Sequence, residues 1–139
     1  MYRTRDVMNT HLVVLRDDAT AEDAIAALVR KGISGAPVVN RSGELVGLIS
    51  EYRLLEAIYE PGFKACPIRE IMTPDPITIS ENAYLSDAAG LMLEHRIRRL
   101  PVVRQGALVG IIARRDLLRY VIESGETLDE FLGEVTAMA

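Results

Sequence analysis

The stretch ISGAPVVN at residues 33–40 recurs as IRRLPVVR at residues 97–104. The two copies belong to a longer repeat, in which residues 7–55 align with residues 71–118. The offset is 64, so that Pro37 aligns with Pro101, and there is one gap at Ser42. A duplicated unit of this length predicts two similar half-modules that pack face to face. Their ligand sites would then come in quasi-equivalent pairs at the junction of the halves.

Each repeat has the hydrophobic pattern of a strand–helix–strand–strand–helix unit, which predicts an α+β fold. The first helix of the first repeat should begin after Thr20, whose side chain can cap it together with Asp23, and should end at Gly32. We expect the residues Ala24, Ile25 and Leu28 of this helix to face inward. The predicted elements are strands at 12–15, 36–40 and 44–49 with helices at 21–31 and 51–59, and then strands at 77–79, 100–103 and 108–112 with helices at 85–95 and 115–123.

The predicted domain organisation follows the repeat. Residues 1–60 form the first unit and residues 61–123 the second, related by a pseudo-two-fold axis, each a small sheet with helices on one side. Residues 124–139 are left over and carry a capping pattern followed by apolar residues at helical spacing, so we predict a short C-terminal amphipathic helix. Such a helix covers its own module or pairs with a second copy of the chain, or else it docks on another protein; we favour the first of these two interpretations.

Composition limits the class of protein. The chain has 139 residues, of which 49% are hydrophobic but only 5% aromatic, so the core should be aliphatic. The net charge of -4 makes nucleic-acid binding an unfavoured function. Cys66 is the single cysteine, which excludes an intramolecular disulfide. Because the sequence has neither a signal peptide nor a run of about 18 apolar residues, we expect a cytoplasmic protein without a membrane partner.

The repeated units resemble CBS domains, and their tandem arrangement resembles a Bateman module. The resemblance rests on residues 33–39 with Gly47-Leu48-Ile49-Ser50, on residues 97–103 with residues 110–117, and on the lead-in segments at residues 7–9 and 71–74. It covers about residues 6–123. Two copies in register, each with its pieces in the same order, make this a specific match.

The resemblance implies a regulatory module that binds adenosine-containing ligands in two clefts between the halves. AMP, ADP and ATP are the candidate ligands, and no cofactor is required. In the family, a Gly-x-x-Ser/Thr-x-x-Asp pattern places a hydroxyl near phosphate and a carboxylate on the ribose diol. Carried over to this chain, cleft A would combine Asp116 and Ile111 with Ile33, Ser34, Asn9 and Val14, and cleft B would combine Ser50 and Arg53 with Thr73, Thr78, Ile97 and Arg98.

Neither unit has the full family pattern. The first has Ser50 but Arg53 in place of the aspartate, and the second has Asp116 but Ala113 in place of the hydroxyl. Asp116 is therefore either a ribose acceptor or an acid that complements the helix dipole, and Ser50 either a ligand contact or a helix cap. Arg53 and Arg98 either select phosphate or have structural roles. In the second case Arg53 pairs with a carboxylate and fills the cleft, while Arg98 is a solvated surface residue or pairs with an acid such as Glu94.

No spacing in the sequence predicts catalysis or a metal site, so we expect a binding module and not an enzyme. A structural dimerisation or protein-interaction module with degenerate pockets is the alternative. We also predict a homodimer that forms through apolar helix faces around Leu54, Ile58, Leu118 and Ile122, and an unidentified effector protein to which the module reports.

Overall fold

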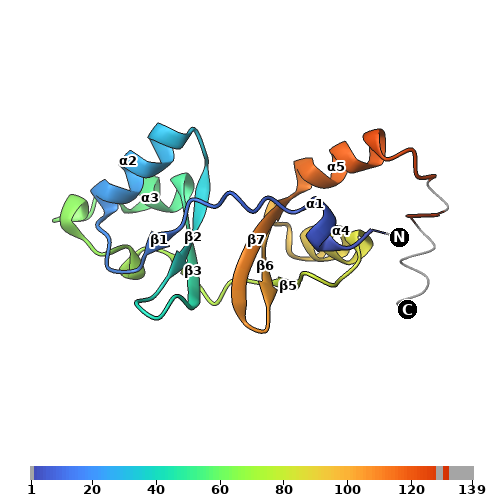
Figure 1. Cartoon of the computed structure of the whole chain (residues 1–139). Coiled ribbons are helices and arrows are strands. Elements are labelled where there is room, and N and C mark those ends of the chain that lie inside the picture. Colours follow the sequence, from blue (N-terminus) through green and yellow to red (C-terminus); the bar gives the residue numbers. More distant parts are fainter. Residues whose placement is uncertain (1, 128–129, 132–139) are drawn as a thin grey trace. The chain divides into compact units, whose positions relative to one another are not determined.

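The computed structural model describes residues 2–127 and 130–131. The chain forms two compact α+β units, each with one small sheet and its helices, as Figure 1 shows. One unit comprises residues 12–76, and the other comprises residues 1–11 together with residues 77–139. The predicted α+β class and the two similar units are confirmed. The compact units are a different division from the sequence repeats, because the lead-in segment of each repeat contributes to the sheet of the other.

The unit of residues 12–76 contains a sheet of four strands in the order β1-β2-β3-β4. β1 and β2 are parallel, and the other neighbours are antiparallel. Its elements are β1 (Leu15–Arg16), α2 (Ala21–Lys31), β2 (Gly35–Val39), β3 (Leu45–Ser50), α3 (Glu51–Ala57), two short 3-10 helices, η1 (Phe63–Ala65) and η2 (Ile68–Glu70), and β4 (Thr73–Pro74).

Helix α2 has the bounds that its sequence predicts. The Thr20 hydroxyl accepts the Asp23 N–H at 3.1 Å, and the Asp23 carboxylate accepts the Thr20 N–H at 3.1 Å. Gly32 ends the helix in the left-handed conformation, with φ of 63°. Ala24 and Leu28 are buried as expected, but the prediction for Ile25 was wrong, since 36% of its surface is exposed.

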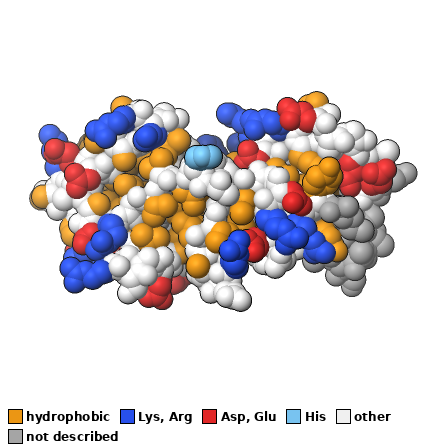
Figure 2. All heavy atoms as spheres, viewed as in Figure 1, with side chains coloured by type: hydrophobic (Ala, Val, Ile, Leu, Met, Phe, Trp, Pro, Cys, Tyr) orange, Lys and Arg blue, Asp and Glu red, His pale blue; other side chains and the backbone are white. Residues whose placement is uncertain are grey.

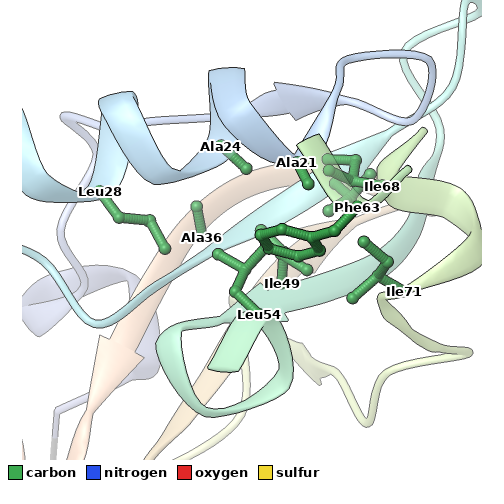
Figure 3. Packing of buried hydrophobic residues seen from close by; sticks show 10 residues of the cluster. Ala21, Ala24, Leu28, Ala36, Ile49, Leu54, Phe63, Ile68 and Ile71 are labelled. Atoms are coloured by element: carbon green, nitrogen blue, oxygen red, sulfur yellow. The ribbon is translucent and has the colours of Figure 1, made fainter. Parts of the chain in front are cut away.

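The core of this unit lies between α2, α3 and the sheet. Figure 3 shows Leu28 and Ala24 of α2 pointing toward Ile49 of the sheet, with Phe63 beside Leu54. Leu28 is 2% exposed and Ile49 is fully buried. Burying such aliphatic side chains stabilises the fold by about 1.5–3 kcal/mol each. The aliphatic core that the composition predicts is therefore present in this unit.

The other unit has a three-stranded sheet in the order β5-β6-β7. Leu85, Leu100, Val102 and Ile112 are fully buried in its core. Helix α4 has the predicted bounds, and the hairpin strands are longer than predicted. The elements are α1 (Thr4–Val7), β5 (Ile79–Ser80), α4 (Leu85–His95), β6 (Arg99–Arg104), β7 (Ala107–Ala113) and α5 (Arg114–Glu123).

The two lead-in segments occupy equivalent places in exchanged units. Asn9 pairs with Ile111 of β7 through two backbone hydrogen bonds of 2.8 and 3.0 Å. Thr73 of β4 pairs with Leu48 of β3 in the same antiparallel manner. Each repeat thus completes the sheet that is built mainly from the other repeat.

Two short strands and one helix differ most from their predicted bounds. The strand predicted at residues 12–15 is reduced to Leu15–Arg16, and the strand predicted at 77–79 to Ile79–Ser80, because each is paired with its parallel neighbour over only two residues. Helix α3 ends at Ala57, two residues before the predicted end. A run of apolar residues was therefore a poor guide to strand length here.

The predicted C-terminal helix lies mostly at residues 128–129 and 132–139, outside the described residues. Of the described part, the Glu130 N–H donates to the Thr127 hydroxyl at 3.1 Å, and the Phe131 N–H donates to the Thr127 carbonyl at 3.1 Å. Phe131 packs against the core of its unit. No helix in the described part of the chain has the length and hydropathy needed to span a membrane.

Candidate functional site

The first candidate site is the corner at which β3 turns into α3. The Ser50 hydroxyl accepts the Arg53 N–H at 3.2 Å, so Ser50 is the N-cap of α3. The Glu51 N–H donates to the Ser34 carbonyl at 2.9 Å, which joins the corner to the segment before β2. The structure therefore brings together Ser34, Ser50 and Arg53, and gives Ser50 the capping role that was one of its two predicted roles.

Arg53 is held by two groups of its own unit. Its Nε donates to the Ile71 carbonyl at 3.0 Å, and its Nη1 lies 2.9 Å from the Glu56 carboxylate. Glu56 stands three residues after Arg53, a helical spacing at which opposite charges meet, so the sequence contained a signal for this pair. The guanidinium also borders a cavity of 410 Å³ that is lined by Arg53, Glu56, Ala57, Glu60, Pro61, Phe63, Cys66, Glu70 and Ile71.

The second candidate site is the corner at which β7 turns into α5. One oxygen of Asp116 accepts the Ala113 N–H at 2.8 Å, which stabilises the start of α5. The other oxygen lies 3.8 Å from Nη1 of Arg119, and 22% of the Asp116 side chain is exposed. The Arg114 N–H donates to the Arg98 carbonyl at 2.9 Å, as Glu51 does to Ser34 in the first corner. A cavity of 300 Å³ along α5 is lined by Tyr2, Asp6, Val7, Asp116, Arg119, Tyr120, Glu123 and Ser124.

The two corners are equivalent in backbone but reversed in charge. Arg53 and Glu56 on α3 correspond to Asp116 and Arg119 on α5, so each helix has one ion pair at spacing i, i+3, with the signs exchanged. An acceptor at one corner is thus replaced by a donor at the other. The two corners cannot bind the same polar group of a ligand in the same way.

The other predicted site residues are divided between the units. Val14 is 38% exposed, and Thr73 lies on the edge strand β4. Asn9 of the lead-in segment is paired with Ile111 of β7, as described above. The combination of residues from the two units into clefts A and B stays a prediction. The unit of residues 12–76 holds Val14, Ile33, Ser34, Ser50, Arg53 and Thr73, and the other unit holds Asn9, Thr78, Ile97, Arg98, Ile111 and Asp116.

Cys66 is the only thiol in the chain and lies in the cavity beside Arg53. Burial and a hydrogen bond from the thiol to the Glu70 carboxylate at 3.2 Å raise the pKa of Cys66. A thiol with a raised pKa is a poor nucleophile and a poor metal ligand. Across residues 2–127 and 130–131, no group of three or more His, Cys, Asp or Glu side chains is arranged to hold a metal ion.

Comparison with known proteins gives a family match over most of the chain. A family model for the CBS domain matches residues 5–60 and again residues 68–123. The A-adding tRNA nucleotidyltransferase of Aquifex aeolicus is 36% identical over 91% of this chain, but the match covers 15% of that protein. CBSX1 of Arabidopsis thaliana is 33% identical over 81% of this chain and 60% of its own length. The chain therefore spans between 15% and 60% of the length of these two curated relatives.

Solved structures share the fold. CBSX2 in complex with AMP has a TM-score of 0.83 and 33% identity, covering 91% of this chain and 100% of that chain. The CBS domain pair of protein MJ0100, in complex with 5-methylthioadenosine and S-adenosyl-L-methionine, has a TM-score of 0.76 and 26% identity, covering 86% and 94% of the two chains.

Proposed function

Because this chain belongs to the CBS-domain family, we propose that it is a non-catalytic regulatory module that binds adenosine-containing ligands such as AMP, ADP or ATP. The ligands of two structural neighbours, AMP on CBSX2 and two adenosyl compounds on the MJ0100 domain pair, support this class of ligand. We also propose that the module works in the cytoplasm and that it reports to an effector protein.

The observation that carries the proposal is the geometry of Asp116. One of its oxygens caps α5 through the Ala113 N–H, and the other lies 3.8 Å from Nη1 of Arg119 in a partly exposed position. A carboxylate oriented in this way can accept hydrogen bonds from the two hydroxyls of a ribose while its capping bond persists. Charge-assisted hydrogen bonds of this kind contribute about 1.5–3 kcal/mol each.

The test must separate ligand binding from helix capping. Asp87 makes the same capping contact at the start of α4, where its carboxylate accepts the Tyr84 N–H at 2.9 Å. Asp116→Asn and Asp87→Asn therefore remove the same charge from the same position of a helix, and each retains an oxygen that can accept the capping bond. We expect isothermal titration with AMP to show a loss of roughly tenfold or more for Asp116→Asn, and wild-type affinity for Asp87→Asn.

Equal AMP affinities for the wild-type chain and Asp116→Asn would show that the ribose role does not apply to this residue. The absence of binding by AMP, ADP and ATP to the wild-type chain would contradict the adenosyl hypothesis itself. A melting-temperature series gives an independent readout, since a ligand that binds only the folded chain must raise the melting temperature.

For the corner at Arg53 the contacts favour the second of its two predicted roles. The guanidinium is occupied by Glu56 and the Ile71 carbonyl, so binding a phosphate there would require an exchange of partners. We propose that Arg53 fills its corner and that the adenosyl ligand binds through Asp116. If Arg53→Asp adds a second AMP site, the filling role is supported; if it abolishes a preference for ATP over AMP, the phosphate-selecting role is correct.

A structural dimerisation module is the second candidate function, and the outer faces of α3 and α5 favour it. Leu55 is 63% exposed, Leu118 64% and Ile122 83%, and Figure 2 shows hydrophobic side chains at the surface. Leu54 was wrongly assigned to this surface, since it is 4% exposed and belongs to the core. We propose a homodimer through these faces. Light scattering should show a dimer at micromolar concentration and a monomer for Leu118→Glu combined with Ile122→Glu.

A further inference from the structure

The cavity of 300 Å³ along α5 is lined by a tyrosine whose hydroxyl group has no partner. Helix α1 lies against α5 here, and both belong to the unit of residues 1–11 and 77–139 (Figure 1). Tyr120 is 9% exposed, and its hydroxyl oxygen is buried without a hydrogen bond to any described residue. An unpaired buried hydroxyl is unfavourable, so the large majority of such groups have a partner. The Tyr120 hydroxyl is therefore available to a ligand.

A second tyrosine completes an aromatic pair in this cavity. The ring centroids of Tyr2 and Tyr120 are 5.0 Å apart, and the ring planes are inclined at 65°. The faces of tyrosine rings carry partial negative charge and attract cations. The aromatic part of the cavity thus favours a positively charged group with apolar carbon atoms.

The charged side chains of the cavity also favour a cation. Asp6, Asp116 and Glu123 line it together with a single basic residue, Arg119. Arg119 lies 3.8 Å from Asp116, and the Asp6 carboxylate accepts a backbone N–H at 2.8 Å. Glu123 forms no salt bridge with another described residue. The cavity therefore has a carboxylate that can pair with a cationic ligand.

The other unit has an equivalent cavity, which serves as an internal control. The cavity of 410 Å³ beside α3 has its lining residues at the offsets of the repeat, 64 before the gap at Ser42 and 63 after it. The correspondences are Glu60 with Glu123, Glu70 with Asp6, Ala57 with Tyr120, and Cys66 with Tyr2. Two acids are thus common to both cavities, whereas the aromatic pair is present in one of them. Because the cavity beside α3 forms without tyrosines, the fold does not require them.

We propose that the cavity along α5 binds a small organic amine through its protonated amino group. An ammonium group has three donors and no acceptor, which matches the Tyr120 hydroxyl oxygen and the Glu123 carboxylate. The ring of Tyr2 contacts the alkyl carbons. A volume of 300 Å³ is at the lower end for small-molecule pockets and suits an amine of a few carbon atoms. The inference does not rest on the adenosyl proposal, since these three side chains belong to neither cleft A nor cleft B.

Calorimetric titration of the full chain with diaminobutane tests the proposal. Tyr120→Phe removes the hydroxyl group and keeps the ring, and Glu123→Gln removes the free carboxylate. Glu60→Gln removes the same charge from the equivalent cavity and is the matched control. We expect the first two variants to bind diaminobutane roughly tenfold more weakly, and Glu60→Gln to keep wild-type affinity.

Melting temperatures give an independent readout. Tyr120→Phe replaces an unpaired hydroxyl, so it should not lower the melting temperature of the free chain. It should nevertheless reduce the rise in melting temperature that diaminobutane produces in the wild-type chain. A variant that melts lower without ligand but binds diaminobutane as the wild type does would show a structural role for the hydroxyl and overturn the proposal.

Two further ligands separate charge from shape. Butanediol has the same carbon chain without charge, and Mg²⁺ has the same charge without a carbon chain; both should bind more weakly than diaminobutane. Equal binding of Mg²⁺, or an equal loss in Glu60→Gln and Glu123→Gln, would indicate general attraction to acidic residues and overturn the proposal. Binding of diaminobutane without AMP binding would support the amine site and contradict the adenosyl proposal, and AMP binding without diaminobutane binding would do the reverse.

Discussion

Replacement of Gly47 by alanine tests the packing of the exchanged lead-in segment on its sheet. A Cβ atom at position 47 would lie 2.4 Å from Sδ of Met72 and 2.8 Å from the Thr73 carbonyl oxygen. The methionine can move, but the carbonyl belongs to β4, which is hydrogen-bonded to β3, so the strand itself must shift. Overpacking of this kind costs about 1–3 kcal/mol, and we expect Gly47→Ala near the upper end of that range.

Gly110 and Gly90 provide graded controls for this prediction. At Gly110 the nearest backbone atom to a Cβ would be the Asn9 oxygen at 3.2 Å, while Sδ of Met8 would be at 2.6 Å. A flexible side chain is the main obstacle there, so Gly110→Ala should cost less than Gly47→Ala. Gly90 lies within α4 with no atom within 4 Å of a Cβ, and Gly90→Ala should stabilise the chain by about 1 kcal/mol.

Urea unfolding of the three variants, followed by circular dichroism, measures these differences. Combining each substitution with methionine truncation sharpens the test. Met8→Ala should relieve most of the strain of Gly110→Ala, whereas Met72→Ala should leave the backbone contact of Gly47→Ala unrelieved. A Gly110→Ala variant that is less stable than Gly47→Ala, or complete relief by Met72→Ala, would refute the reasoning from backbone contact.

Other predictions concern two titrating groups and one fragment. Hydrogen bonds from Arg104 at 2.7 and 3.0 Å hold the pKa of Glu81 below its usual 4.5. The pair therefore stabilises the folded chain at pH values above the pKa of Glu81 in the unfolded chain. This contribution is lost as the pH falls through the lower pKa of the folded chain. The melting-temperature difference between the wild-type chain and Arg104→Gln should therefore shrink in acid. Glu70→Gln removes a group that raises the pKa of Cys66, and should accelerate the reaction of this thiol with a disulfide reagent near pH 8. The fragment of residues 12–76 should fold alone by circular dichroism, whereas a fragment that lacks β4 should not.

The helices were predictable because the signals that fix their ends are local. Thr20, Asp23 and Gly32 determine the ends of α2 through contacts within a few residues, and both bounds were predicted correctly. Strands depend on partners far away in the sequence. The apolar run at residues 12–15 has a strand's composition, but only Leu15 and the residue after it meet a neighbouring strand.

The exchange of lead-in segments could not be predicted from the repeat. An alignment shows that Met8 corresponds to Met72 but not which sheet either one joins. That choice depends on the close approach of each lead-in segment to a glycine, Gly47 or Gly110, of the sheet that it joins. The sequence alone does not distinguish a glycine that permits such a contact from one that is needed for a turn or a helix cap. The exchange is thus a property of the folded chain that the repeat of residues 7–55 and 71–118 leaves open.

The candidate site residues could be located from the sequence, but their roles could not. Ser50 and Asp116 occupy the positions from which the family pattern was identified, yet each also makes a hydrogen bond that its helix needs. Their presence alone therefore cannot separate a binding site from a well-capped helix, since selection for stability would retain both. The ion pairs of the two corners differ in this respect, because Arg53 and Glu56 on α3 and Asp116 and Arg119 on α5 occupy equivalent positions with opposite signs. Functional evidence in a duplicated fold is strongest where the two copies share a backbone and differ in chemistry.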